Sequence, residues 1–176
     1  RHLQISADLG ESAGLPQHAY RLRVVMARLE RARGDIARAL ELLDEAAPRY
    51  DTDFSPPVRP VAAIRARVQL AHGDLDEARA WAAASSLRPD DELSYVREYE
   101  HITLARILIA AGRDDRRAID EAIGLLDRLL TAATDGGRAG SAIEILILQA
   151  TAHHAAGDTA AAITALEDAL RRAAAE

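Results

Sequence analysis

The sequence contains no cysteine, no lysine and no asparagine, and one Trp, four Tyr and one Phe are its only aromatic residues. The lack of cysteine excludes disulfide bonds and metal sites built on thiolates. With so few aromatic residues, alanine and leucine must fill the core, and these side chains suit closely packed helices. The net charge is −6, so we expect no direct binding of nucleic acid.

Long hydrophobic runs are also missing. Arg106 and Glu144 interrupt the two most apolar stretches, so neither reaches the roughly 18 residues that a membrane helix needs. No signal peptide is recognisable either. We therefore predict a cytoplasmic protein without membrane contact. Because the chain begins with Arg1 rather than methionine, we also expect it to be a fragment of a larger protein.

One short phrase occurs four times along the chain: a glycine, an acidic residue and then a helix with alanine at a fixed place. The glycines are spaced by 39, 39 and 45 residues, a period typical of stacked helical hairpins. The phrase pairs Gly34 with Ala39, Gly73 with Ala78, Gly112 with Ala122, and Gly157 with Ala162. We predict an all-α, right-handed superhelical array of antiparallel helix hairpins, similar to tetratricopeptide repeats.

The expected array is one domain, 1–176, with about four hairpins and a leading partial helix at about 2–11. The predicted helix pairs are 16–33 with 35–47, 59–72 with 74–86, 92–111 with 115–134, and 140–156 with 158–174. Each repeat glycine should end a first helix in the left-handed conformation. Asp35, Asp74 and Asp158 should then cap the second helices.

Small and apolar residues also keep the repeat register. Alanines seven residues before each glycine should let the paired helices approach closely; these are Ala27, Ala66, Ala105 and Ala150. Leu43, Leu126 and Leu166 lie four residues after three of the second-helix alanines, and should be buried against the neighbouring hairpin. The third unit has about five extra residues at 113–117, which we place in a solvated turn.

The first helices of such an array line its concave side, and this is where we expect a ligand or partner groove. Arg28, Arg67 and Arg106 occupy one repeat position and define the arginine row, with Arg21 and His154 at neighbouring positions. Guanidinium groups in a row can bind carboxylates or phosphates. The alternative is that these arginines are solvated and paired with acids such as Glu30, Glu98 and Glu100.

The segment 90–101 departs most from the repeat pattern. It combines acids with Tyr95, Tyr99, Arg97 and His101. Tyrosines four residues apart share one helix face and offer apolar area together with a hydroxyl, as a small-molecule pocket requires. The alternative is that Tyr95 and Tyr99 wedge between adjacent hairpins.

No constellation of catalytic or metal-binding residues is apparent. His153 and His154 are adjacent on a helix and point about 100° apart, so they cannot both ligate one ion unaided. There is no nucleophile elbow and no phosphate-binding glycine loop. We expect neither enzyme activity, nor a bound metal, nor a cofactor in this chain.

Several strings resemble the helical-repeat region of large ATP-dependent LuxR-type regulators, whose architecture is that of the maltose-regulon activator. These strings are Gly14-Leu15-Pro16, Asp53-Phe54-Ser55-Pro56, Leu93-Ser94-Tyr95 continuing to Arg106, and Ser141-Ala142-Ile143. The resemblance implies a parent protein with an amino-terminal NTPase and a carboxy-terminal helix-turn-helix domain. It implies that this region binds an inducer or regulatory protein and signals to those domains.

Two functions follow as hypotheses. The first is a sensor domain of a transcriptional activator, whose ligand changes the curvature or self-association of the array. The alternative is a free-standing scaffold that binds a helix or peptide of another protein in the groove.

Overall fold

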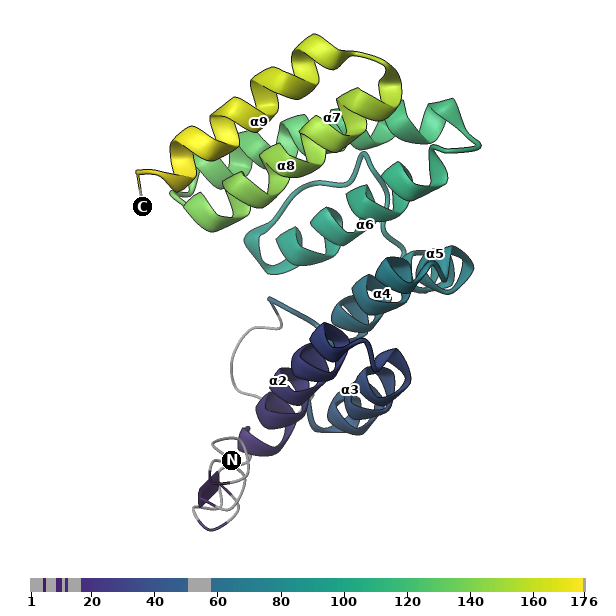
Figure 1. Cartoon of the computed structure of the whole chain (residues 1–176), viewed down its shortest axis with the longest axis vertical. Helices are drawn as coiled ribbons and strands as arrows, with labels where there is room; N and C mark the ends of the chain where they lie inside the picture. The colour runs from purple at the N-terminus through teal and green to yellow at the C-terminus, as the bar shows by residue number, and fades with distance from the viewer. Residues whose placement is uncertain (1–4, 6–8, 11, 13–16, 51–57, 176) are drawn as a thin grey trace. The chain divides into compact units, whose positions relative to one another are not determined.

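The computed structural model describes residues 5, 9–10, 12, 17–50 and 58–175. The described residues form helices and connections, with no strand among them. Figure 1 shows α2 (His18–Arg33), α3 (Ile36–Tyr50), α4 (Val61–His72), α5 (Leu75–Ala84), the short 3₁₀ helix η1 (Tyr95–Arg97), α6 (Glu98–Ala111), α7 (Arg116–Asp135), α8 (Ala139–Ala156) and α9 (Thr159–Ala173). This is the all-α helical-repeat fold that the sequence predicts. The predicted leading helix at 2–11 lies mostly outside the described residues.

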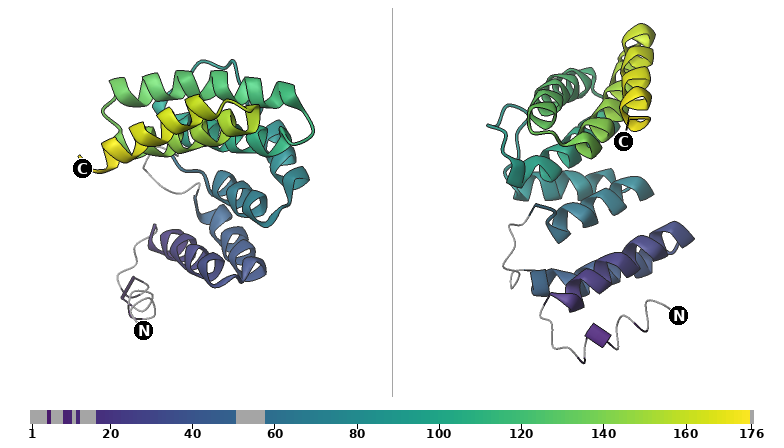
Figure 2. Two further views of the ribbon diagram at one scale, coloured as in Figure 1. Left: turned by 45° about the horizontal axis from the view of Figure 1, so that its top comes forward. Right: turned by 90° about the vertical axis from the view of Figure 1, so that its left-hand side faces the viewer.

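The chain divides into two compact units, Arg1–Glu77 and Ala78–Glu176, with the boundary inside α5. In the first unit α3 packs against both α2 and α4. In the second unit the contacts run in chain order, from α6 to α7, α7 to α8 and α8 to α9 (Figure 2). Two to four residues join α2 to α3, α6 to α7, α7 to α8 and α8 to α9, so each of these pairs is an antiparallel hairpin or the contact between neighbouring hairpins.

The small residues of the repeat lie where these helices meet. Ala27 and Ala39 are buried in the first unit, and Ala105 and Ala122 are buried in the second. Ala78 and Ala162 are buried as well, whereas Ala150 is only half-buried. Burial confirms the predicted packing position for these alanines except Ala150, and the close approach of the paired backbones stays a prediction.

The leucines of the second helices follow the prediction in two of three copies. Leu43 of α3 and Leu126 of α7 are fully buried, and each of these helices packs against the first helix that follows it, α4 or α8. The prediction is wrong for Leu166, which is 47% exposed on α9, because no helix follows α9 in the described residues.

Three of the four repeat glycines adopt the predicted left-handed conformation. Gly34, Gly73 and Gly157 have φ of 87°, 103° and 85° and end α2, α4 and α8. The prediction is wrong for Gly112, which has φ of −66° and stays right-handed. A Cβ at Gly112 would overlap Cδ1 of the fully buried Ile119. Close approach of a side chain, rather than backbone conformation, therefore requires glycine at 112.

Aspartates cap the second helices as expected where the structure gives a capping bond. Oδ1 of Asp35 accepts from the backbone N–H of Arg38 at 3.0 Å, and Oδ1 of Asp158 accepts from that of Ala161 at 3.0 Å. Capping by Asp74 stays a prediction. Asp115, which the sequence predicts only to lie in a turn, caps α7; its Oδ1 accepts from the N–H of Arg117 at 3.0 Å.

Several predicted boundaries differ from the structure. α6 begins at Glu98 instead of 92, because residues 85–97 form a connection held by tertiary contacts. α3 continues through Pro48 to Tyr50, three residues beyond the predicted end. Only part of the 113–117 insertion is a turn, since Arg116 and Arg117 already belong to α7. No helix among the described residues has the length and apolar composition needed to cross a bilayer.

We predict that Gly112→Ala lowers the free energy of unfolding by about 1–3 kcal/mol, because the new methyl group would displace the buried Ile119 side chain. Urea unfolding monitored by circular dichroism measures this. The cost should be smaller when Gly112→Ala is introduced into an Ile119→Ala chain, which leaves space for the methyl group.

Gly124→Ala is the matched control for this prediction. Gly124 lies within α7, and a methyl group added there would meet no neighbouring side chain within 4 Å. Its replacement should therefore stabilise the chain by about 0.5–1 kcal/mol, since alanine is the better helix former. Equal effects of Gly112→Ala and Gly124→Ala would contradict the proposed role of Ile119.

Candidate functional site

The connection between α5 and α6, residues 85–97, is where the second unit departs from the short turns of the array. It contains Ser86 in a left-handed conformation, with φ of 52°, which is uncommon for a residue other than glycine. Leu87 is buried, whereas Tyr95 and Val96 are exposed. The connection thus has an anchored part and an exposed part.

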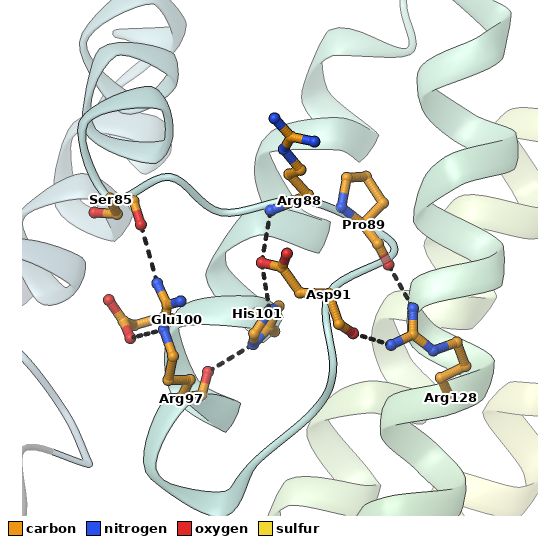
Figure 3. A network of polar contacts seen from close by, with 8 residues as sticks. All are labelled: Ser85, Arg88, Pro89, Asp91, Arg97, Glu100, His101 and Arg128. Carbon is orange, nitrogen blue, oxygen red and sulfur yellow. Dashed lines mark hydrogen bonds and ion pairs between the residues drawn. The ribbon is translucent and has the colours of Figure 1, made fainter.

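A buried histidine anchors the middle of the 85–97 connection. His101 of α6 is fully buried, with Nδ1 3.0 Å from the carbonyl oxygen of Arg97 and Nε2 3.4 Å from Oδ2 of Asp91 (Figure 3). Since a carbonyl oxygen only accepts, Nδ1 carries the proton of the first bond. The same Asp91 oxygen accepts from the backbone N–H of Arg88 at 2.9 Å. The bond from Arg88, and then the bond with His101, lower the pKa of Asp91 below its ordinary value.

Two arginines anchor the connection from its ends. Arg97 donates from Nη2 to the carbonyl of Ser85 at 3.0 Å, while its Nε donates to Glu100 at 3.1 Å. From α7, Arg128 donates to the carbonyl of Pro89 at 2.7 Å and to that of Asp91 (Figure 3). These backbone carbonyls of the connection are outside any helix and so lack helical hydrogen bonds. Arg97, just before α6, and Arg128, on α7, supply donors to them.

A second polar cluster joins the start of α6 to the turn between α7 and α8. Glu98 is buried, and its Oε2 accepts from Nε of Arg138 at 2.7 Å. Its Oε1 accepts from the Ser141 hydroxyl at 2.7 Å. The Arg138 guanidinium also lies 5.6 Å from the centre of the Tyr95 ring, a cation–π contact. Tyr95 is nevertheless 59% exposed, so part of its ring is available to a binding partner.

The predicted site residues of the second unit fall into different environments. Tyr95 is exposed on η1, and Tyr99 is half-buried on α6. Arg106 is half-buried and donates from Nη2 to Glu144 of α8 at 3.0 Å, so the first helices α6 and α8 meet at this point. His154 is exposed near the end of α8. The structure connects Arg106 to an acid and leaves Tyr95 and His154 accessible.

The other predicted site residues belong to the first unit. Arg28 is exposed on α2 and Arg67 is half-buried on α4. Arg21 is exposed beside Tyr20, with its Nε 3.3 Å from the tyrosine hydroxyl. The arginine row is thus divided between the two units, and the groove predicted from it stays a prediction.

The acids named as alternative partners of the arginine row bind other arginines instead. Glu30 pairs with Arg33 one helical turn away, and Glu100 pairs with Arg97. Glu98 pairs with Arg138, which lies 40 residues along the chain. The three acids named as examples thus pair with nearer donors, whereas Arg106 does pair with an acid, Glu144, so the alternative for the arginine row stays open.

The sequence pattern marks the segment 90–101 but does not reveal what holds it. The sequence does not predict Asp91 and His101 as anchors, and it does not predict Arg128, Arg138 and Ser141 as site residues. The partners of these three lie roughly 40 residues away in sequence, so no local pattern marks them. Among the described residues, no group of three or more histidines or acids is arranged to hold a metal ion.

Comparison with known proteins gives one family. A family model described as the MalT-like TPR region, where TPR denotes the tetratricopeptide repeat, matches residues 1–176. No curated protein and no solved structure matches the chain significantly.

We predict that Arg138→Ala destabilises the chain by roughly 3 kcal/mol, because it leaves the buried Glu98 carboxylate without its charged partner. This loss lies at the low end for buried pairs, since Arg138 keeps some contact with solvent. Adding Glu98→Gln should recover part of the loss, because a neutral side chain is buried at lower cost. Chemical denaturation measures the free energy of unfolding of each variant.

The matched control is Arg117→Ala, which breaks the exposed pair with Glu121 on α7. Such surface pairs contribute at most about 1 kcal/mol. If Arg138→Ala cost no more than Arg117→Ala, the Glu98 cluster would not be a structural anchor.

We predict that Asp91 makes stability depend on pH at the acidic end. Its pKa is lowered in the folded chain, so the stabilisation is fully present above the ordinary pKa of 3.8 and is lost as the pH falls through the lowered value. The difference in unfolding free energy between wild type and Asp91→Asn should therefore be constant from about pH 7 to pH 5 and shrink below about pH 4. A difference that stays constant down to about pH 3 would rule out ionised Asp91 as an anchor.

Proposed function

Since this chain belongs to the MalT-like TPR region family, we propose that it is the sensor and interaction domain of a LuxR-type transcriptional regulator. It binds an inducer or a regulatory protein and signals this event to NTPase and DNA-binding domains outside this chain. The proposal places it in the cytoplasm and assigns it no catalytic step.

The observation that carries the proposal is the family match along all 176 residues. The fold supports it, because stacked helical hairpins present extended surfaces to partners and transmit displacements between neighbouring repeats. In the second unit, the α6–α7 hairpin contacts the α8–α9 hairpin, because both α6 and α7 pack against α8. A ligand that shifts one hairpin therefore acts on the next one.

We place the ligand-responsive surface at the exposed part of the 85–97 connection. Tyr95 and Val96 offer accessible apolar area, and Arg138 gives this area a polar edge. An exposed aromatic ring beside a guanidinium group is typical of the residues that dominate binding energy at interfaces. Beneath this surface, the connection is held at Ser85 by Arg97 and tied to α7 through Arg128.

This arrangement offers a physical route for the signal. Tyr95 contacts Arg138, and Arg138 binds Glu98 at the start of α6. Arg138 also immediately precedes α8, so a ligand that moves Tyr95 changes the relation between α6 and α8. The Arg106–Glu144 pair joins the same two helices further along.

A free-standing interaction scaffold is the second candidate function. The observation that favours it is the exposed apolar face of α9, where Leu166 and Leu170 are accessible. A scaffold would bind its protein partner without a small molecule and without NTPase or DNA-binding domains.

We predict that Tyr95→Ala, in the full-length regulator, lowers inducible transcription at least about fivefold, as expected when an aromatic hot spot is truncated. A reporter gene under a promoter that the regulator activates measures this transcription. Basal expression and the level of the regulator are recorded in parallel. Arg171→Ala on α9 is the control, because Arg171 is exposed and pairs only with Asp168 in the described part of the chain. It should respond like wild type.

Titration calorimetry separates the two candidate functions. Binding of a small molecule by the isolated chain, lost in Tyr95→Ala, supports the sensor. Unchanged induction in Tyr95→Ala and in Arg106→Ala would remove both the 85–97 surface and the arginine row from the proposal.

A further inference from the structure

Both ring nitrogens of His101 face oxygen atoms inside the protein. The side chain is fully buried, so neither nitrogen reaches water. Nδ1 lies 3.0 Å from the carbonyl oxygen of Arg97, and Nε2 lies 3.4 Å from Oδ2 of Asp91. An oxygen that can only accept requires a proton on the nitrogen opposite it. The protonation of the ring therefore depends on whether both oxygens are pure acceptors.

The Asp91 oxygen is such an acceptor. It also accepts a hydrogen bond from the backbone N–H of Arg88 at 2.9 Å. This bond, and then the bond with His101, lower the pKa of the carboxyl group, which is therefore ionised at neutral pH. An ionised carboxylate has no proton to donate, and neither has a backbone carbonyl. His101 thus faces two acceptors at once.

A neutral imidazole ring cannot bond to both of them. It carries one N–H donor and one nitrogen lone pair. With the proton on Nδ1, the lone pair of Nε2 points at the carboxylate; with the proton on Nε2, the lone pair of Nδ1 points at the carbonyl of Arg97. Such a buried, unmade bond costs free energy. The doubly protonated, positively charged ring donates to both oxygens.

The charged groups on the elements around the ring leave Asp91 to His101. α6 packs against η1, α7 and α8. Polar partners of the acids on these helices include Arg138 for Glu98, Arg97 for Glu100, Arg106 for Glu144, and Gln149 for Asp127. On α7, Arg128 bonds backbone carbonyls of the connection. The cationic side chain that bonds the Asp91 carboxylate is His101. Burial and the nearby start of α6 oppose a positive charge on the ring, and this carboxylate offsets them.

The bond between His101 and Asp91 joins a closed turn to α6. In the turn 88–91, the N–H of Asp91 donates to the carbonyl of Arg88 at 3.3 Å, and the Asp91 carboxylate bonds back to the N–H of Arg88. Arg128 joins the same turn to α7, whereas His101 joins it to α6 (Figure 3). A guanidinium group stays charged at any pH that a folded protein meets, but an imidazole ring does not. The two joints therefore differ in their response to pH.

We propose that His101 is a proton-dependent latch of the 85–97 connection. The doubly protonated ring holds the turn 88–91 on α6. Loss of the Nε2 proton at higher pH breaks the bond to Asp91, while Arg128 keeps the turn on α7. A rise in pH thus loosens one joint of the segment that carries Tyr95 and leaves the helices folded. The latch is a property of the folded chain, whether or not that chain binds an inducer.

Nitrogen-15 chemical shifts of the His101 ring test the latch directly. They are measured on the 176-residue chain at pH 6 and pH 9 and assigned by comparison with His101→Gln. At pH 6 both ring nitrogens should have the shifts of protonated nitrogen. At pH 9 Nε2 should have the shift of a bare nitrogen, while Nδ1 keeps its proton. A neutral ring at pH 6, or shifts that are the same at both pH values, would overturn the proposal.

The pH dependence of stability gives a second test. The glutamine of His101→Gln supplies an uncharged donor, so its bond to Asp91 does not need an added proton. In wild type the bond forms only with the proton bound, so its stabilisation is present at pH 6 and lost by pH 9. The unfolding equilibrium constant of wild type, relative to that of His101→Gln, should therefore rise at least about fivefold from pH 6 to pH 9.

His154→Gln is the matched control. His154 is exposed on α8, so its replacement should leave the pH dependence of unfolding as in wild type. A histidine that is buried in the neutral form gives the opposite trend, because its burial then opposes protonation at pH 6. A relative unfolding constant for His101→Gln that follows this opposite trend, or that matches the control, would contradict the latch.

Discussion

Close contact between paired helices at alanine is the constraint on which the rest of the structure depends. Ala27 and Ala39 are buried between α2 and α3, and Ala105 and Ala122 are buried where α6 meets α7. A side chain larger than methyl would separate the backbones and shift every contact in the hairpin. Because such a contact between paired helices occurs within each of the two units, a residue's distance from it determines which neighbour that residue meets.

Polar contacts decide where the array departs from regularity. The 85–97 connection has few apolar residues of its own, and its carbonyls are bound by Arg97 and Arg128 while His101 holds Asp91. Donors fixed on packed helices give this segment a defined shape without a hydrophobic core. A base fixed in this way under Tyr95 suits the recognition surface that we propose, because little conformational entropy is then lost on binding.

The same register explains specificity between neighbouring helices. Apolar contacts such as those of Leu43 and Leu126 would accept many amphipathic helices, since hydrophobic burial is non-directional. The bonds from Arg65 to Asp44 and from Gln149 to Asp127 add a directional requirement at one position.

The sequence by itself determined the helical hairpins, their register and the ends of α2, α4 and α8, because these depend on local signals: periodic alanine, left-handed glycine and capping aspartate. It could not distinguish Gly112 from the other repeat glycines, since only the packed Ile119 reveals why glycine is needed there. The start of α6, the partners of Glu98 and the exposure of Leu166 were decided by tertiary structure. Each depends on which residue, some 40 positions away or in the next helix, lies beside it, and no local pattern encodes that neighbour.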